Sequence, residues 1–222
     1  MSKLKVWMAQ IRANFLILSV FLVALGIALS LKHPAPYMEF SYLRAILVLL
    51  GVVSAHISVN LFNEYSDYKT EIDFNTQRTP FSGGSGMIVS GKSSPKTVLW
   101  VAVITLIFAL IIGFYLSMVA HWLILFFAIT GAFSILFYTD FLSKYMLGEL
   151  FAGLSLGTLV VLGTYISINE GFSYETSIYL TEEVIWLSIP PGILTALLLF
   201  INQFPDMDAD IKGGRKHLVI RL

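Results

Sequence analysis

Residues 60–73 read NLFNEYSDYKTEID and end a long apolar segment with an amide and two carboxylates spaced four residues apart. A second apolar segment, far along the chain, ends in the same way. The two copies consist of Asn63, Asp67 and Glu71, and of Asn202, Asp206 and Asp210. Because an α-helix repeats every 3.6 residues, each copy is expected to form one stripe along one helix face. We call these the first and second carboxylate stripes.

Two carboxylate stripes that face each other would gather several negative charges at one depth. Such charges repel, and they raise one another's pKa unless a cation lies between them. Mg²⁺ is the usual occupant of a carboxylate-rich site built of oxygen atoms, and substrate phosphate oxygens commonly complete its shell. A single acidic residue at a helix end could simply be hydrated, so it is the repetition that favours a shared site. The spacing therefore predicts a phosphorylated ligand held through Mg²⁺.

The composition places this site in a membrane protein. Of the 222 residues, 57% are hydrophobic and only 13% are charged, with a mean hydropathy of +0.80, far outside the range of soluble domains. About 20 apolar residues are needed to cross a bilayer. Six segments approach this length: 13–31, 43–62, 97–118, 121–139, 147–168 and 184–204. We expect an all-α fold, a polytopic transmembrane bundle of six helices in a single domain over residues 1–222.

Basic residues are distributed unevenly over the two sides of this expected bundle. When the connections are assigned alternately to two sides, only Lys32 and Arg44 fall on one side, and the other twelve of the 14 Lys and Arg residues fall on the side of both chain ends. Cytoplasmic loops carry such an excess of basic residues. We therefore predict a multi-pass protein of the plasma membrane with both ends of this chain, and both carboxylate stripes, on the cytoplasmic side.

The connection over residues 72–96 is long, polar and rich in Gly and Ser. Long connections without structure of their own are often functional in compact domains. Gly83, Gly84 and Gly86 allow the backbone to approach a ligand closely. A flexible connector is the alternative interpretation, but the position directly after the first carboxylate stripe favours a lid.

These segments resemble the UbiA superfamily of intramembrane prenyltransferases. Residues 63–71 are similar to its N-D-x-x-D-x-x-x-D signature, and residues 202–222 are similar to its N-x-x-x-D-x-x-x-D-x-x-x-G-[KR] segment. RTPFSGGSG (78–86) and YTDFLSKYMLGEL (138–150) look most like the branch that prenylates 1,4-dihydroxy-2-naphthoate. The resemblance extends from about residue 12 to the last residue.

The resemblance implies Mg²⁺-dependent transfer of a polyprenyl group from an allylic polyprenyl diphosphate to an aromatic acceptor, with 1,4-dihydroxy-2-naphthoate of menaquinone biosynthesis as the favoured acceptor. The implied partners are these two substrates and the lipid bilayer, and no nucleic acid. The implied metal ligands are Asp67, Glu71, Asp206 and Asp210. The residues expected to bind the diphosphate are Asn63, Lys69, Arg78, Asn202, Lys212 and Arg215. Catalytic roles are expected for Asp67, Asp206, Asp210, Lys144 and Tyr138, the last by shielding an allylic cation with its ring.

The chain departs from the family pattern in two respects. Glu stands at position 71 where Asp is usual, so either Glu71 or Asp73 could complete the first metal site. Family members typically have about nine spanning helices, so six helices indicate a chain that is truncated at its C-terminus.

Three alternatives stay open. The acceptor could instead be 4-hydroxybenzoate, homogentisate or a glycerol-phosphate ether lipid. The chain could be a transporter that uses its carboxylates, although transporter sites tend to lie near the bilayer midplane and these stripes close their helices at one edge. A non-catalytic fragment or scaffold is the third alternative.

Overall fold

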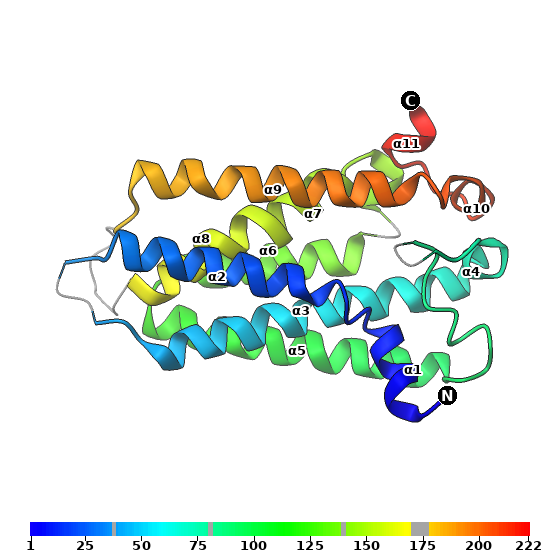
Figure 1. Ribbon diagram of the computed structural model, residues 1–222, viewed down its shortest axis with the longest axis horizontal. Coiled ribbons are helices and arrows are strands. Elements are labelled where there is room, and N and C mark those ends of the chain that lie inside the picture. The colour runs from blue at the N-terminus through cyan, green and yellow to red at the C-terminus, as the bar shows by residue number, and fades with distance from the viewer. Residues whose placement is uncertain (37–38, 80–81, 139–140, 170–177) are drawn as a thin grey trace.

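The computed structural model describes residues 1–36, 39–79, 82–138, 141–169 and 178–222, without the side chain of Lys144. All regular structure in these residues is helical, which confirms the all-α prediction. The long helices lie side by side along the longest axis of the molecule (Figure 1). They are α2 (Leu16–Lys32), α3 (Tyr42–Lys69), α5 (Pro95–Val119), α6 (Leu123–Phe137), α8 (Leu159–Asn169) and α9 (Glu182–Gln203).

One set of short helices lies at one end of this bundle, and a second set leads from α6 into α8. Both chain termini lie at the end that holds α1 (Lys3–Gln10), α4 (Ile72–Asn75), α10 (Met207–Lys212) and α11 (Leu218–Arg221) (Figure 1). Between α6 and α8 the chain forms η1 (Leu142–Tyr145), α7 (Gly148–Ala152) and η2 (Gly153–Thr158). Both chain ends therefore lie at the same end of the bundle, as expected. That this end faces the cytoplasm stays a prediction.

The helices begin and end where local side chains satisfy or remove backbone hydrogen-bonding groups. Ser41 caps α3 by accepting a hydrogen bond from the Arg44 amide at 3.3 Å. Thr181 caps α9 in the same way through the Val184 amide, at 3.4 Å. Pro95 opens α5, at a position where its missing amide hydrogen has no cost. These caps fix the helix ends that the apolar runs define only approximately.

All six predicted apolar segments form helices, but not all are long enough to span a bilayer. Four are long and apolar enough: Tyr42–Lys69, Pro95–Val119, Gly148–Asn169 and Glu182–Gln203. Helices α2 and α6 have 17 and 15 residues. At 1.5 Å per residue they reach about 25 and 22 Å, less than the roughly 30 Å of a hydrocarbon core. The prediction of six spans is thus supported in four helices and stays unconfirmed in two.

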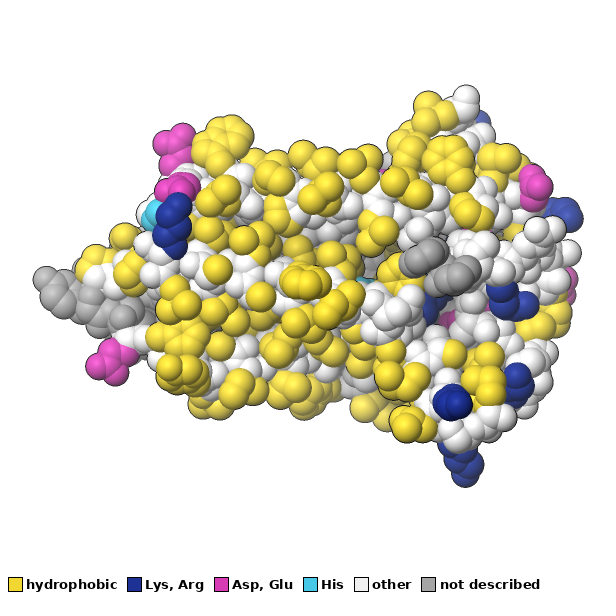
Figure 2. All heavy atoms as spheres, in the orientation of Figure 1, with side chains coloured by type: hydrophobic (Ala, Val, Ile, Leu, Met, Phe, Trp, Pro, Cys, Tyr) yellow, Lys and Arg dark blue, Asp and Glu magenta, His cyan; other side chains and the backbone are white. Residues whose placement is uncertain are grey.

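Large apolar side chains cover the middle of the molecule, and charged side chains gather at its ends (Figure 2). On α5, for example, Ile104 and Ile111 are 59% and 60% exposed. Such a surface would be unstable in water and matches the apolar interior of a bilayer. The chain is therefore an integral membrane protein whose polar ends lie at the two interfaces.

Candidate active site

A cavity of about 350 Å³ lies inside the bundle. Helices α3, α5, α6, α8 and α9 contribute most of its lining, which is largely apolar. Four carboxylates line it, all of them contributed by segments at the end of the bundle that carries the termini: Asp67, Asp73, Asp206 and Asp210. The cavity therefore joins an acidic end to an apolar interior.

The first carboxylate stripe begins as predicted and then leaves the helix. Asn63 and Asp67 lie on α3 and line the cavity. Helix α3 ends at Lys69, and Glu71 adopts a left-handed backbone conformation (φ 60°) that turns the chain into α4. As a consequence Glu71 is exposed, whereas Asp73 is 2% exposed and lines the cavity. The expected continuation of the stripe through Glu71 is wrong, because the helix does not reach it.

The second carboxylate stripe is divided between two helices. Asn202 belongs to α9, and Asp210 belongs to α10. Pro205 follows the end of α9, where its missing amide hydrogen cannot continue the helix, and Asp206 precedes α10. Nevertheless all three members of this stripe line the cavity. The three residues therefore all face the cavity, although the helix is interrupted between Asn202 and Asp210.

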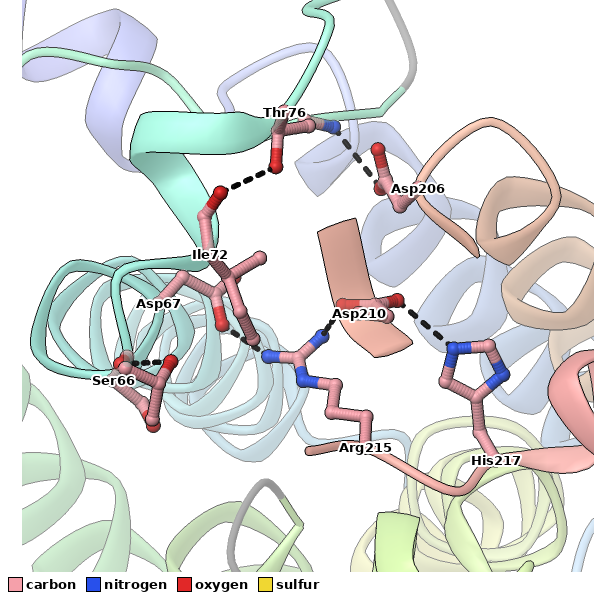
Figure 3. Close-up of polar contacts among 10 residues, drawn as sticks. Ser66, Asp67, Ile72, Thr76, Asp206, Asp210, Arg215 and His217 are labelled. Atoms are coloured by element: carbon pink, nitrogen blue, oxygen red, sulfur yellow. Dashed lines mark hydrogen bonds and ion pairs between the residues drawn. The ribbon is translucent and has the colours of Figure 1, made fainter. Parts of the chain in front are cut away.

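The two stripes meet through one guanidinium group (Figure 3). Arg215 Nη2 forms an ion pair with Asp67 Oδ1, and Arg215 Nη1 lies 3.1 Å from Asp210 Oδ1. A planar guanidinium presents donors on several edges, so it can bind two carboxylates at once. Asp67 of the first stripe and Asp210 of the second therefore lie close together, and their binding of one ligand through Mg²⁺ stays a prediction.

The glycine-rich segment lines the cavity and contacts carboxylates. The Gly83 amide donates to Asp206 Oδ2 at 3.1 Å. The Ser85 amide donates to Glu64 Oε2 at 2.9 Å, and its hydroxyl donates to Glu64 Oε1. Gly84 adopts φ +65°, and a Cβ there would lie 2.6 Å from Asp73 Oδ1. Residues 82–86 therefore contact acidic groups next to both stripes, as expected of a segment that covers a site.

Buried carboxylate oxygens at the cavity lack a partner. Asp73 Oδ2 and Asp206 Oδ1 have no hydrogen bond within the described residues. Burial raises the pKa of Asp73 to about 7, and the neighbouring Asp67 carboxylate adds to the shift. Burial also raises the pKa of Asp206 to about 6, although the Gly83 amide opposes it. Burial is the main cause of both raised pKa values, and neighbouring carboxylates add to them.

These oxygens suit a hard divalent cation. The described residues do not hold three or more His, Asp or Glu side chains gathered as a finished metal centre. The donors are nevertheless all carboxylates, which suit Mg²⁺ with substrate oxygens in the remaining positions. The unpartnered oxygens of Asp73 and Asp206 are therefore the observation that fits a metal bound together with a substrate.

The remaining predicted residues divide into two groups. Tyr138 lines the cavity, and its Cε2 lies 3.0 Å from the position that a Cβ on Gly148 would take. Lys69 and Lys212 are exposed and do not line the cavity. Arg78 is exposed too, and its Nη2 donates to the Asp73 carbonyl at 2.7 Å, so it supports the turn. The side chain of Lys144 lies outside what the structure describes.

Two further residues belong to the site. Arg12 lines the cavity from the connection between α1 and α2, and its charge lowers the pKa of both Asp73 and Asp206. His217 is 1% exposed, and its Nε2 lies 2.9 Å from Asp210 Oδ2 (Figure 3). In the sequence Arg12 counts only toward the excess of basic residues on one side, and the spacing of His217 from Asp210 marks no shared helix face. Neither residue has a local sequence signal that points to the site.

Comparison with known proteins places the chain in a family. The model of the "UbiA prenyltransferase family" matches residues 17–222. A 1,4-dihydroxy-2-naphthoate octaprenyltransferase of Bacillus subtilis (strain 168) is 29% identical over 193 residues, which cover 83% of this chain and 56% of that protein. The Haemophilus influenzae protein of the same name is 28% identical over 222 residues, 99% of this chain and 70% of the relative.

A shorter match concerns a related substrate. A 2-carboxy-1,4-naphthoquinone phytyltransferase of Synechocystis is 30% identical over 76 residues, 34% of this chain and 22% of the relative. No solved structure matches the chain. The chain spans little more than half the length of the Bacillus relative.

Proposed function

This chain belongs to the UbiA prenyltransferase family, and from that premise we propose that it transfers a prenyl group from an allylic polyprenyl diphosphate to 1,4-dihydroxy-2-naphthoate. The observation that carries the proposal is the union of two carboxylate stripes at the end of an apolar cavity. A diphosphate needs the acidic, cation-binding end, and its prenyl tail needs the apolar interior. One cavity offers both.

The choice of acceptor rests on the relatives. The Bacillus and Haemophilus proteins are named for 1,4-dihydroxy-2-naphthoate, and the Synechocystis protein is named for a carboxylated naphthoquinone. A naphthalene ring with oxygen substituents is common to all three names. The dihydroxylated ring of 1,4-dihydroxy-2-naphthoate is electron-rich, so it can attack an allylic cation without a side-chain nucleophile.

We assign the divalent metal site to the carboxylates at the cavity. Asp67, Asp73, Asp206 and Asp210 would hold Mg²⁺, with Glu71 replaced by Asp73 because only the latter lines the cavity. When bound, the metal supplies positive charge that neutralises the diphosphate and stabilises it as a leaving group.

The side chains of the chain itself bind and orient the reactants. Arg215 and Arg12 line the cavity beside the carboxylates and are placed to attract diphosphate oxygens. Asn63 and Asn202 line it from the two stripes and can donate hydrogen bonds to the same group. Tyr138 lines the cavity with an aromatic ring, whose face can stabilise positive charge on the allyl group. Residues 82–86 would exclude water by covering the mouth.

The experiment uses membranes that contain the full-length protein. Radiolabelled prenyl diphosphates are incubated with 1,4-dihydroxy-2-naphthoate, 4-hydroxybenzoate or homogentisate, with and without Mg²⁺. We expect labelled product from the naphthoate alone, and only when Mg²⁺ is present. Product from another acceptor would keep the family chemistry and change the substrate. No product from any acceptor would overturn the proposal and leave transport or a structural role.

We also propose that the protein lies in the plasma membrane with both ends of this chain in the cytoplasm. The excess of Lys and Arg on the side of the chain ends supports this orientation. Prenyl diphosphates are charged and would then reach the carboxylates from the cytoplasm. A cysteine introduced at Ser2 should react with an impermeant thiol reagent only after the cells are opened.

A further inference from the structure

A histidine side chain lines the cavity away from the carboxylates. His56 is on α3, is 6% exposed and lines the cavity. It precedes Asn63 by seven residues and Asp67 by eleven, so it lies about 10 and 16 Å from them along the helix axis. Seven residues are close to two full turns, and His56 therefore shares the face of the first carboxylate stripe. It lies too far from that stripe to belong to a diphosphate site.

The imidazole of His56 is held by a neighbouring helix. Its Nδ1 lies 2.8 Å from Ser19 Oγ, and Ser19 on α2 is fully buried. Within the described part of the chain this is the one hydrogen bond that His56 makes. In either tautomer the second ring nitrogen, Nε2, keeps one hydrogen-bonding function. Ser19 thus orients a ring that still has a polar group to offer.

Five hydroxyl groups that line the cavity are already satisfied within their own helical segments. Each of these hydroxyls donates to the carbonyl four residues earlier in the chain: Ser134, Ser155, Thr164, Ser167 and Thr195. Such hydroxyls offer little to a ligand beyond an apolar surface. His56 differs because its hydrogen bond to Ser19 leaves a nitrogen unused.

We propose that His56 recognises the aromatic acceptor by a hydrogen bond from Nε2 to an oxygen substituent of its ring. A prenyl tail has no polar atom to pair with an imidazole, so it would leave this polar group without a partner, which is unfavourable in a buried site. The acceptor is the substrate that carries ring oxygens, and it must lie on the apolar side of the diphosphate to reach the reacting carbon. His56 is then a specificity-determining residue, and Ser19 is its positioning residue. This inference rests on the proposed function.

The test measures the Michaelis constants of both substrates in the full-length protein. His56→Leu removes the hydrogen bond and should raise KM for 1,4-dihydroxy-2-naphthoate about tenfold, the usual effect of one lost hydrogen bond. KM for the prenyl diphosphate should stay unchanged. His56→Gln keeps a donor and an acceptor and should restore part of the loss. Ser19→Ala should raise the acceptor KM about threefold, since it only loosens the ring.

Ser58→Ala is the matched control. Ser58 is fully buried on the same helix, bonds the Ala102 carbonyl at 2.8 Å and does not line the cavity. Both of its Michaelis constants should equal those of the unaltered protein. An equal effect of Ser58→Ala would show that His56 acts only through the stability of α3.

A second measurement is independent of turnover. Equilibrium binding of 1,4-dihydroxy-2-naphthoate to the purified protein, followed by the fluorescence of the ligand, should weaken about tenfold in His56→Leu. An acceptor KM within twofold of normal in His56→Leu overturns the inference while the proposed function stands. If His56→Leu does not fold, an unchanged acceptor KM in both His56→Gln and Ser19→Ala overturns it in the same way. Absence of transfer by the unaltered protein would instead overturn the proposed function.

Discussion

The two carboxylate stripes share one sequence pattern but differ in structure. In the first stripe, α3 continues past Asp67 and stops at Lys69, so that Glu71 turns away from the cavity. In the second, the helix breaks before Asp206, yet Asp210 still faces the cavity from α10. The comparison shows that the spacing of four residues selects a face only while the helix lasts. Beyond the helix end, the turn decides which carboxylate reaches the site.

The largest effects are expected for Asp67 and Asp210, one carboxylate from each stripe, because both line the cavity. Asp67→Ala and Asp210→Ala should each lower prenyl transfer about 100-fold or more, because each removes a carboxylate from the proposed metal site, a contribution of several kcal/mol. Asp208→Ala is the matched control, since Asp208 is exposed and does not line the cavity. Steady-state rates in membranes measure the three variants. If Asp67→Ala keeps normal turnover, the proposed metal site is wrong.

The next effect concerns the residue that joins the stripes. Arg215→Met removes the cation shared by Asp67 and Asp210. Breaking a buried ion pair by removing one partner typically costs about 3–5 kcal/mol, so the melting temperature in detergent should fall by several degrees. Added Mg²⁺ should restore more stability to this variant than to the unaltered protein, because it replaces the missing positive charge.

Lys216→Ala provides the control for Arg215. It removes a neighbouring positive charge from an exposed position, and its melting temperature should stay within a degree or so of normal. A large loss in Lys216→Ala would mean that net charge, and not the bridge between the stripes, stabilises this end of the bundle.

A smaller effect separates the two acids that end the first stripe. Asp73→Ala should lower transfer about tenfold, whereas Glu71→Ala should change it less than about twofold, because Asp73 is buried at the cavity and Glu71 is exposed. The apparent affinity for Mg²⁺, measured from the metal dependence of the rate, should weaken in Asp73→Ala alone. The reverse order would restore the simple four-residue stripe and would mean that Glu71 swings inward when substrate binds.

Much of the fold follows from the apolar segments, and the exceptions have physical causes. All six segments form helices, but α2 begins only at Leu16, because Arg12 adopts a left-handed conformation (φ 50°) that separates it from α1. No composition or periodicity predicts that turn. It shortens α2 below the length of a span, and it also carries Arg12 to the cavity.

The site, like the fold, can be predicted from the sequence only as far as the helices extend. The members of the stripes that precede the helix ends, Asn63, Asp67 and Asn202, line the cavity as the spacing predicts. Asp73 and His217 reach the site through turns, whose direction depends on tertiary contacts rather than on a repeat. Sequence reasoning therefore identifies the helical part of the site and leaves its ends undecided.

The smallest effect tests how the glycine-rich segment joins the two stripes. Gly84 lies against Asp73, which follows the first stripe on α4, and the neighbouring Gly83 donates to Asp206 of the second stripe. Gly84→Ala incurs two costs: about 1–2 kcal/mol for a side chain in a left-handed conformation, and a clash with Asp73 Oδ1, 2.6 Å from the added Cβ. The segment must then move away from the cavity mouth. We expect a rise of about threefold to fivefold in KM for the prenyl diphosphate, from the loss of about 1 kcal/mol of binding.

Gly91→Ala incurs only the first of these costs, so the comparison of the two variants isolates the clash with Asp73. Gly91 has φ +69°, close to the φ +65° of Gly84, but an added Cβ would have no described atom within 4 Å. This variant should therefore lose similar stability without any change in the diphosphate KM. Melting temperatures in detergent compare the strain, and Michaelis constants compare the contact with Asp73. Equal Michaelis constants in the two variants would mean that the segment does not cover the site, and that its hydrogen bonds to the carboxylates serve only to hold the turn.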